Sequence, residues 1–270
     1  MVPPQIESTS VLHLSQLEEV GSGLNSTVYK LKGSKIVVKV PRQNSMLHHE
    51  VERSIYERFE RLPSNANILK YLGETKVERS NATVFAPGLL FEYHPEGILR
   101  DVLETNLAPP PADYQKLRFS TDLASALVFV HSCHVVHGDI GLHNILFSRE
   151  PHARMILADF GGSRIDQSQF LSWPSARYRM EGRDYQSGET YEPTEQHDIF
   201  ALGMVIYEIM TWSQAWKGKE HPEVLALIRQ QQFPDLQLVT LKAMEEVIGN
   251  CWGRQYVVAS DLLSDLEGMP

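Results

Sequence analysis

Two short acidic motifs in the second half of the chain are its most informative residues. His137-Gly138-Asp139-Ile140-Gly141-Leu142-His143-Asn144 follows a long amphipathic segment, and Asp159-Phe160-Gly161 follows the strand-like run 155–158. An aspartate and an asparagine from one loop suit a general base and a metal ligand, and a carboxylate directly after a strand can hold Mg²⁺ against phosphates. Residue frequencies give the two patterns together in about one chain in a hundred thousand or fewer. The pair therefore predicts phosphoryl-transfer chemistry.

The first half of the chain supplies a candidate phosphate contact. Lys39 lies in the run Val37-Val38-Lys39-Val40, whose neighbours are expected to be buried, and burying an ammonium group is costly unless it meets an anion. Glu52 lies beside the apolar stripe of the helix that follows, so it is the expected partner, with Glu50 as the alternative. A lysine that extends its charged end into solvent from an edge strand is the other interpretation.

A glycine-rich turn, Gly21-Ser22-Gly23-Leu24-Asn25-Ser26-Thr27-Val28, joins the first two predicted strands. Glycine lets backbone amides approach phosphate groups closely, so this turn is a candidate phosphate-covering loop. Ser26 replaces the third glycine of such a loop, and an ordinary hairpin turn accounts for the pattern about as well.

These motifs need elements to position them, and the hydrophobic pattern changes at about residue 95. Before it, strands are predicted at 17–21, 28–31, 36–40, 71–77 and 89–93, with one helix at about 45–61. After it, helices are predicted at about 99–104, 114–132, 195–212, 222–230, 238–251 and 258–266. We expect a single α+β domain over residues 1–270. It would have a small antiparallel strand-rich lobe at about 12–92, a hinge at about 92–96 and a larger helical lobe at about 97–268.

With these motifs in this order, the chain resembles the eukaryotic protein kinase family from about Leu17 to Leu266. The segment Asp198-Ile199-Phe200-Ala201-Leu202-Gly203 looks like the start of the family's central helix, whose aspartate holds the catalytic loop from beneath. Cys251-Trp252 looks like the end of its penultimate helix. The resemblance implies a bilobal kinase fold, ATP and Mg²⁺ as cofactors, and a protein substrate. The His-Gly-Asp loop and the compact ending look most like kinase-like domains of filamentous fungi.

The resemblance also implies a role for each site residue. Lys39 would hold the α- and β-phosphates and pair with Glu52, Asp139 would be the catalytic base, and Asn144 and Asp159 would bind Mg²⁺. The glycine-rich loop would contribute Gly21, Ser22, Gly23 and Ser26, and the gatekeeper position would be Phe91. Backbone groups of the hinge residues Glu92 and His94 would meet adenine. The apolar side chains that pack on adenine would be Val28, Val37 and Leu146.

Around the catalytic loop the chain departs from the family's pattern. Gly138 stands where most members carry the arginine that receives an activation-loop phosphate, so activation by loop phosphorylation is not expected. Gly141 stands in the place of a lysine and His143 in that of an arginine. His143 is then either a substitute cation or a solvent-facing histidine. Losing one such charge typically slows transfer about 10²–10³-fold, so reduced or atypically regulated activity is expected.

The family's Ala-Pro-Glu is missing as well. Arg177-Tyr178-Arg179-Met180-Glu181-Gly182 stands roughly in its place, and the arginine that usually pairs with its glutamate is not found after Cys251-Trp252. Losing both halves of a buried ion pair is far milder than losing one. The chain is therefore interpreted as a substituted scaffold and not as a decayed one.

Three functions fit these residues. The first is a protein kinase that transfers the γ-phosphate of ATP to Ser or Thr, ahead of Tyr, supported by the intact lysine, glutamate and three loop residues named above. The second is a pseudokinase that binds nucleotide only to stiffen a surface for partners, supported by Ser26, Gly138 and Gly141. The third is a small-molecule kinase like the aminoglycoside and choline phosphotransferases, which share a His-Gly-Asp loop with an asparagine further along.

Composition sets the remaining limits. A formal net charge of −9 argues against nucleic acid as a partner, because phosphate backbones bind clustered Lys and Arg. The start of the chain lacks the pattern of a signal peptide, and the longest apolar-rich run, 199–210, is too short to cross a bilayer. Cys133 and Cys251 are expected to be buried free thiols. We therefore expect a soluble cytoplasmic protein without membrane insertion.

Overall fold

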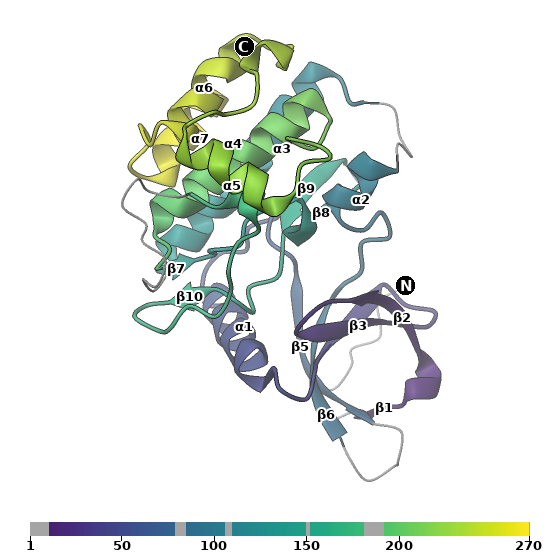
Figure 1. Ribbon diagram of the computed structural model, residues 1–270. Coiled ribbons are helices and arrows are strands. Elements are labelled where there is room, and N and C mark those ends of the chain that lie inside the picture. Colours follow the sequence, from purple (N-terminus) through teal and green to yellow (C-terminus); the bar gives the residue numbers. More distant parts are fainter. Residues whose placement is uncertain (1–10, 79–84, 106–109, 150–151, 181–191, 270) are drawn as a thin grey trace. The chain divides into compact units, whose positions relative to one another are not determined.

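The computed structural model describes residues 11–78, 85–105, 110–149, 152–180 and 192–269 (Figure 1). The chain divides into two compact units, whose described residues lie within 11–62 and 69–95 (unit 1) and within 63–68 and 96–269 (unit 2). Unit 1 is rich in strands and unit 2 in helices, so the predicted α+β fold class is confirmed. Glu181 and Gly182, from the segment that replaces Ala-Pro-Glu, lie outside the described residues.

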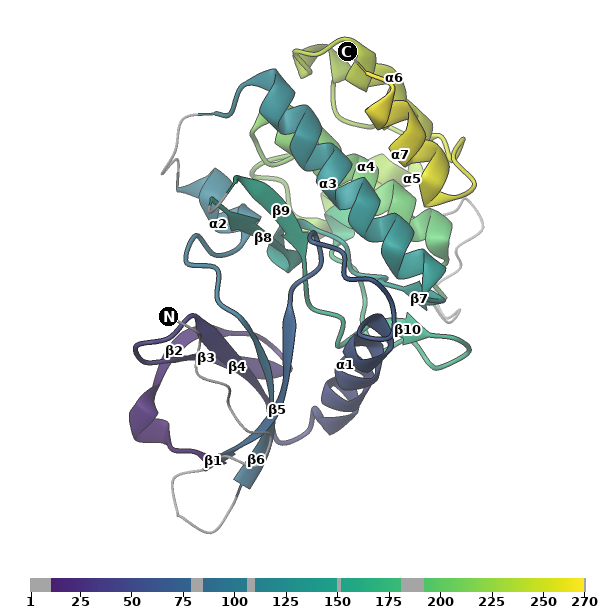
Figure 2. The ribbon, with the colours of Figure 1, turned by 180° about the vertical axis from the view of Figure 1, so that it is seen from behind.

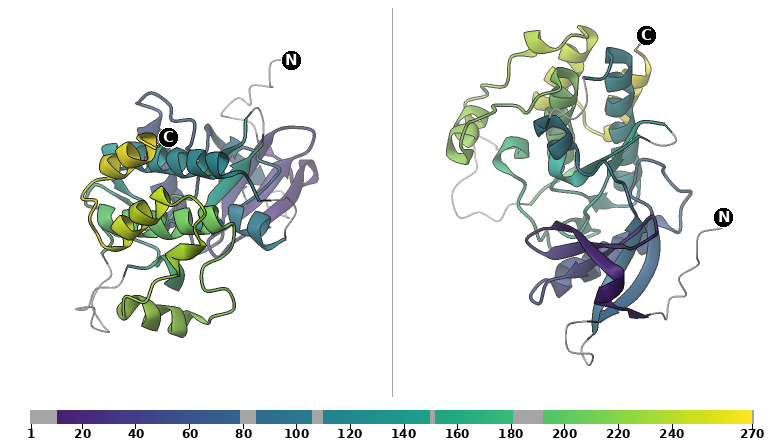
Figure 3. Two further views of the ribbon diagram at one scale, coloured as in Figure 1. Left: turned by 90° about the horizontal axis from the view of Figure 1, so that it is seen from above. Right: turned by 90° about the vertical axis from the view of Figure 1, so that its right-hand side faces the viewer.

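Unit 1 is built on one six-stranded sheet that curls, as Figure 3 shows. Its strands are β1 (Val11–Leu12), β2 (Leu17–Ser22), β3 (Ser26–Leu31), β4 (Ile36–Pro41), β5 (Tyr71–Glu78) and β6 (Phe85–Glu92), in the order β1-β5-β6-β4-β3-β2. Neighbouring strands are antiparallel, except that β1 pairs in parallel with β5. The sequence did not predict β1, because two residues are too few to show an alternating pattern.

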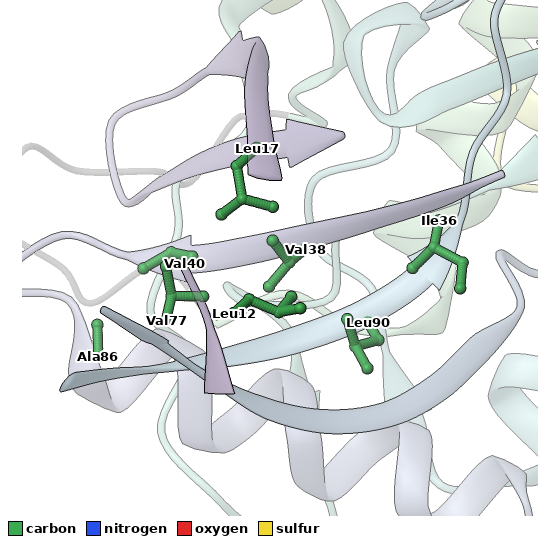
Figure 4. Close-up of a cluster of buried hydrophobic side chains, with 8 residues drawn as sticks. All are labelled: Leu12, Leu17, Ile36, Val38, Val40, Val77, Ala86 and Leu90. Atoms are coloured by element: carbon green, nitrogen blue, oxygen red, sulfur yellow. The ribbon is translucent and has the colours of Figure 1, made fainter. Parts of the chain in front are cut away.

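One face of this sheet carries the apolar core of unit 1. Figure 4 shows its buried members, which are Leu12, Leu17, Ile36, Val38, Val40, Val77, Ala86 and Leu90. Successive side chains of a strand point to opposite faces. Because Val38 and Val40 of β4 belong to this core, Val37 and Lys39 of the same strand lie on the other face.

Helix α1 (Met46–Phe59) of unit 1 packs near that other face through Ile55, Tyr56 and Phe59, which are all buried. The ring of Tyr56 lies 4.9 Å from that of Phe91 in β6, between ring centroids. Glu52 precedes Tyr56 by one helical turn and therefore lies on the same side of the helix. The helix thus brings a carboxylate to the face of the sheet that carries Lys39.

Unit 2 is organised around a buried helix, α4 (Glu195–Thr211), in which every residue from Asp198 to Met210 is buried. Helix α3 (Asp113–Ser132) packs against α4 and against α7 (Ala259–Glu267), and α6 (Ala243–Trp252) also packs on α4 (Figures 1 and 2). The shorter helices are α2 (Leu99–Glu104) and α5 (His221–Arg229).

The predicted helices of unit 2 all form, with one displaced boundary. Helix α6 begins at Ala243 and not near residue 238, because residues 236–238 form a separate 3₁₀ turn. The carboxylate of Asp235 accepts a hydrogen bond from the Gln237 amide at 2.9 Å and so caps that turn.

Two small ribbons of unit 2 frame the acidic motifs. Strand β7 (Val135–Val136) pairs with β10 (Arg164–Ile165), and β8 (Ile145–Ser148) pairs with β9 (Arg154–Leu157). The first motif runs from the end of β7 to the start of β8, with a 3₁₀ turn at Leu142–Asn144, and Asp159 follows β9. The strands on either side therefore fix both ends of each motif.

Cys133 and Cys251 are buried free cysteines, as the sequence predicted. Among the helices of the described ranges, none is both long enough and apolar enough to cross a membrane.

Candidate active site

In unit 1, Lys39 forms an ion pair with Glu52. The distance from Nζ to Oε2 is 2.6 Å, and the two side chains are 15% and 3% exposed. Glu50, the alternative partner, is exposed. Strand β4 lies between β3 and β6 and is not an edge strand, so Lys39 does not reach solvent in the way the other interpretation required. The pair is the electrostatic arrangement that a phosphate-binding lysine needs.

The glycine-rich turn joins β2 and β3, and its backbone closes at the tip. The Gly23 amide donates to the Ser26 carbonyl at 2.9 Å, while Gly21 pairs opposite Val28 after a register shift in β2. Ser22, Ser26 and their neighbours therefore lie on one short hairpin, which is the structure that both interpretations of the turn require.

Arg42, which the sequence did not mark, holds this turn. Its Nε donates to the Gly23 carbonyl at 2.9 Å and its Nη2 to the Ser22 hydroxyl oxygen at 2.8 Å. Its backbone amide donates to the Asn25 carbonyl at 2.8 Å. An exposed arginine just after a strand carries no motif, so only the folded hairpin shows that Arg42 contacts the tip.

The predicted adenine contacts are distributed over both units. In unit 1, Val37 lies opposite Phe91, and Val28 lies opposite Lys39 in the neighbouring strand. Phe91 is 2% exposed and His94 is also buried. The backbone amide of Glu92, also in unit 1, donates to the Lys70 carbonyl at 3.1 Å. Leu146 belongs to β8 of unit 2 and lies opposite Ile156.

In unit 2, the loop that carries Asp139 is held by Asp198 of α4. Its Oδ2 accepts the His137 amide at 2.8 Å and its Oδ1 accepts the Gly138 amide at 2.7 Å. The Nε2 of His131, from α3, lies 3.0 Å from Oδ2. Asp198 is only 1% exposed, and a buried carboxylate with several charge-assisted hydrogen bonds is a strong anchor. His131 was missed because a histidine on an apolar helix carries no signal of its partner.

His137 connects the two acidic motifs. Its Nε2 lies 3.1 Å from the Ala158 carbonyl, and its ring centroid lies 4.9 Å from that of Phe160. The Ala158 amide in turn donates to the Asn144 carbonyl at 2.9 Å. The structure therefore brings the Asp139–Asn144 loop beside the segment that carries Asp159.

Both carboxylate oxygens of Asp139 contact side chains of its own loop. Nδ2 of Asn144 lies 3.2 Å from Oδ2 and also donates to the Asp139 carbonyl at 2.8 Å, and Nε2 of His143 lies 3.3 Å from Oδ1. The Asp139 side chain is 23% exposed. It is thus an oriented carboxylate that a substrate hydroxyl can approach.

Asn144 and Asp159 are suitable ligands for Mg²⁺. The amide nitrogen of Asn144 is used by Asp139, so its oxygen Oδ1 is the atom that could serve a cation. Asp159 adopts a left-handed backbone conformation, with φ +63°, and its Oδ1 accepts the Gly161 amide at 3.4 Å. Carboxylate and amide oxygens are the ligands that this small, hard cation prefers.

The two unusual glycines of the catalytic loop lie at close contacts. Gly138 has φ +72°, and a Cβ there would lie 2.0 Å from Cε2 of Phe170. A Cβ at Gly141 would lie 2.6 Å from Cε2 of Tyr178 and 2.7 Å from Cε1 of His143. At both positions a ring occupies the space that a side chain would need.

The segment in place of Ala-Pro-Glu is anchored to α4 by Tyr178 and Arg177. The Tyr178 hydroxyl donates to Oε2 of Glu208 at 2.8 Å and accepts the Leu142 amide at 3.4 Å. Nε of Arg177 donates to the Ala215 carbonyl at 2.7 Å and lies 3.9 Å from Oε1 of Glu208. Burial raises the pKa of Glu208 to about 7 and that of Tyr178 well above its usual value. A single carboxylate inside the apolar run 199–210 was the available signal for this site.

The helical unit, the strand-rich unit and the two acidic loops define a protein kinase domain. The sequence profile of the family described as protein tyrosine and serine/threonine kinase matches residues 14–257, and the chain belongs to this family.

Curated relatives include kinases from several organisms. The chain is 21% identical over 267 residues to dual specificity protein kinase shkE of Dictyostelium discoideum, which covers 93% of this chain and 35% of that protein. It is 25% identical over 247 residues to the probable serine/threonine-protein kinase SIS8 of Arabidopsis thaliana (87% and 22%). It is 26% identical over 160 residues to receptor-interacting serine/threonine-protein kinase 2 of Bos taurus (55% and 29%). The chain thus spans about a third or less of the length of these relatives.

Proposed function

We propose that the chain is a protein kinase that uses ATP and Mg²⁺ to phosphorylate Ser or Thr side chains of proteins. The observation that carries this proposal is the state of Asp139. Its carboxylate is oriented at both oxygens, is partly open to solvent, and lies on a loop whose backbone is anchored to the buried Asp198. A carboxylate in that state suits a general base.

In the proposed reaction the substrate hydroxyl attacks the γ-phosphorus of ATP. A bond forms between that hydroxyl oxygen and phosphorus while the bond from phosphorus to the β–γ bridging oxygen breaks. ADP leaves with the electron pair, and the hydroxyl proton passes to Asp139. Lys39, held by Glu52, would bind the α- and β-phosphates, and the glycine-rich hairpin would cover them.

Asn144 and Asp159 would hold Mg²⁺, which when bound neutralises charge on the phosphate oxygens. The remaining predicted contacts of the nucleotide belong to the same proposal: Gly21, Ser22, Gly23, Ser26, Val28, Val37, Phe91, Glu92, His94 and Leu146. Because Gly138 offers no cation, we do not expect transfer to require a phosphate on the activation segment.

Serine and threonine are proposed ahead of tyrosine as acceptors. The relatives from Arabidopsis and Bos are named as serine/threonine kinases, whereas the Dictyostelium relative is named as a dual specificity kinase. A phosphoamino-acid analysis of any labelled protein substrate decides between the acceptors.

The nucleotide site is tested first by thermal unfolding with and without Mg²⁺-ATP. A ligand present at 100 times its Kd adds about 2.7 kcal/mol to the free energy of unfolding, which is a shift of several degrees. The shift should disappear in Asp159→Ala, because the variant lacks a proposed Mg²⁺ ligand. Without a shift at millimolar Mg²⁺-ATP, the proposal fails at its first step.

Transfer is tested next with γ-labelled ATP and protein acceptors. Asp139→Asn should lower kcat by roughly 10²–10⁴, the usual contribution of general acid–base catalysis. Asp261→Asn, at an exposed position in α7, is the matched control and should keep wild-type transfer. Nucleotide binding without any transfer would identify a pseudokinase, and transfer only to small alcohols or amines a small-molecule kinase.

A further inference from the structure

The catalytic loop contains a histidine in direct contact with the proposed base. Nε2 of His143 lies 3.3 Å from Oδ1 of Asp139, and the two side chains are 27% and 23% exposed. Since an ionised carboxylate only accepts hydrogen bonds, the imidazole is the donor. This places a donor on the one oxygen of Asp139 that Asn144 does not contact.

The position of the imidazole is built by its surroundings. Its ring centroid lies 6.0 Å from that of Tyr178, whose hydroxyl is held by Glu208. The backbone between Asp139 and His143 leaves room for the ring only because residue 141 is glycine. A Cβ at that position would lie 2.7 Å from Cε1 of His143 and 2.6 Å from Tyr178.

Gly141 and His143 therefore form one arrangement. The backbone φ of Gly141 is −178°, which any residue adopts, so conformation does not require glycine there. Contact does, because the space beside Cα is filled by two rings. A long side chain at 141 and the observed imidazole position exclude each other.

We infer that His143 is a positioning residue that orients the carboxylate of Asp139 for proton acceptance, and that Gly141 is required to seat it. This inference rests on the proposed function. The contact acts as a hydrogen bond from Nε2, and this proton stays on the imidazole while Asp139 accepts the proton of the substrate hydroxyl. With Asn144 on the other oxygen, the loop fixes its base from two sides.

The first test compares His143→Ala with His221→Ala, which changes an exposed histidine at the start of α5. His143→Ala should lower kcat about 10- to 100-fold, the cost of a misplaced catalytic group, with KM for ATP and the thermal shift by Mg²⁺-ATP unchanged. Imidazole in the buffer should restore part of the lost rate, and His143→Gln, which keeps a donor, should lose less. A kcat for His143→Ala within twofold of wild type overturns the inference.

The second test restores the family's lysine with Gly141→Lys. If a cation were merely missing, this substitution would raise kcat, and that result contradicts the inference. We expect kcat to fall at least as far as in His143→Ala, because the new side chain displaces the imidazole. A lowered unfolding midpoint in Gly141→Lys would leave the decision to the His143 variants.

Failure of the proposed function gives a different result. If the wild-type chain binds Mg²⁺-ATP but phosphorylates no acceptor, the kinase assignment fails, and a crystal structure of His143→Ala then decides the positioning role. An Asp139 carboxylate turned away from Asn144 supports that role, and an unchanged carboxylate rules it out.

Discussion

The Lys39–Glu52 pair of unit 1 and the Asp139–Asn144 loop of unit 2 hold their side chains in different ways. In unit 1 the Lys39 ammonium, whose side chain is 15% exposed, meets the buried Glu52 carboxylate at 2.6 Å. In unit 2 the cations expected at 138 and 141 are replaced by glycine, and rings of Phe170, Tyr178 and His143 occupy the space. The loop is nevertheless anchored and its carboxylate oriented.

This difference shows that close packing can replace some groups of a functional site but not others. A group that positions a loop can be exchanged for close contacts, because positioning needs only a filled volume and satisfied hydrogen bonds. A group that binds a ligand's charge has no such substitute. We therefore expect substitutions of Lys39 to abolish the binding of phosphate charge. Substitutions around Gly138 and Gly141 should instead disturb the geometry of the loop.

Among the variants that test this comparison, Lys39→Met should have the largest effect. Transfer should fall by at least ~10²–10³-fold, because the phosphates lose their cation. The substitution also leaves Glu52 buried without the lysine, which costs stability, so unfolding must be measured beside activity. Lys39→Met/Glu52→Gln should recover stability but not transfer. Recovery of transfer in the double variant would show that Lys39 only neutralises Glu52.

Glu208→Gln probes the buried support of the loop through pH. Burial raises the pKa of Glu208 from 4.5 to about 7, so the folded state binds this proton more tightly than the unfolded state. Stability should therefore fall as the pH rises from about 4.5 to 7, by on the order of 3 kcal/mol, and stay low above it.

The wild-type pH profile also contains an opposing contribution from His197. Burial lowers the pKa of His197 from 6.5 to about 4. The contribution of His197 to the free energy of unfolding is therefore lost as the pH falls through that range. Urea unfolding of wild type and Glu208→Gln at several pH values separates the two, because only Glu208 differs. Parallel profiles for the two proteins would contradict the role of Glu208.

The sequence predicted the parts of the site that depend on local pattern. The strand around Lys39 and the partner helix could be placed because alternation and helical spacing show which side chains share a face. The order of the acidic motifs was enough to predict the family, and the match of the family profile to residues 14–257 confirmed that prediction. The assignment of chemical roles to those residues stays a prediction.

What the sequence could not predict are contacts between residues distant along the chain. Gly138 and Gly141 looked like losses, since nothing local indicates that Phe170 and Tyr178 lie against them. His131 on Asp198 and Arg42 on the glycine-rich turn are of the same kind. Each depends on the three-dimensional path of the backbone, which one sequence does not reveal.

Gly138→Ala tests whether packing on Phe170 matters beyond backbone conformation. Gly97→Ala is the matched control, because Gly97 has nearly the same φ, +74°, but nothing within 4 Å of an added Cβ. In both variants an alanine with a left-handed backbone conformation should lower the free energy of unfolding by about 1–2 kcal/mol. Overpacking against Phe170 should lower it by a further ~1–3 kcal/mol in Gly138→Ala alone. Equal losses would mean that Phe170 moves aside freely, and the loop would then be less tightly built than unit 1.

Arg42→Ala should have the smallest effect, and it tests unit 1 for the same kind of support by contacts. Arg42 is exposed, so its two side-chain hydrogen bonds to Ser22 and Gly23 contribute about 1 kcal/mol to holding the turn. If the turn covers the phosphates, that energy appears in ATP binding as a roughly fivefold higher KM for ATP. The kcat should stay unchanged, because the hydrogen bonds of Arg42 hold the turn and not the proposed base. Arg61→Ala, at an exposed arginine after α1, is the control for lost charge alone. An equal rise in KM in both variants would assign the effect to long-range attraction of the nucleotide. The hydrogen bonds of Arg42 to the turn would then contribute nothing to ATP binding.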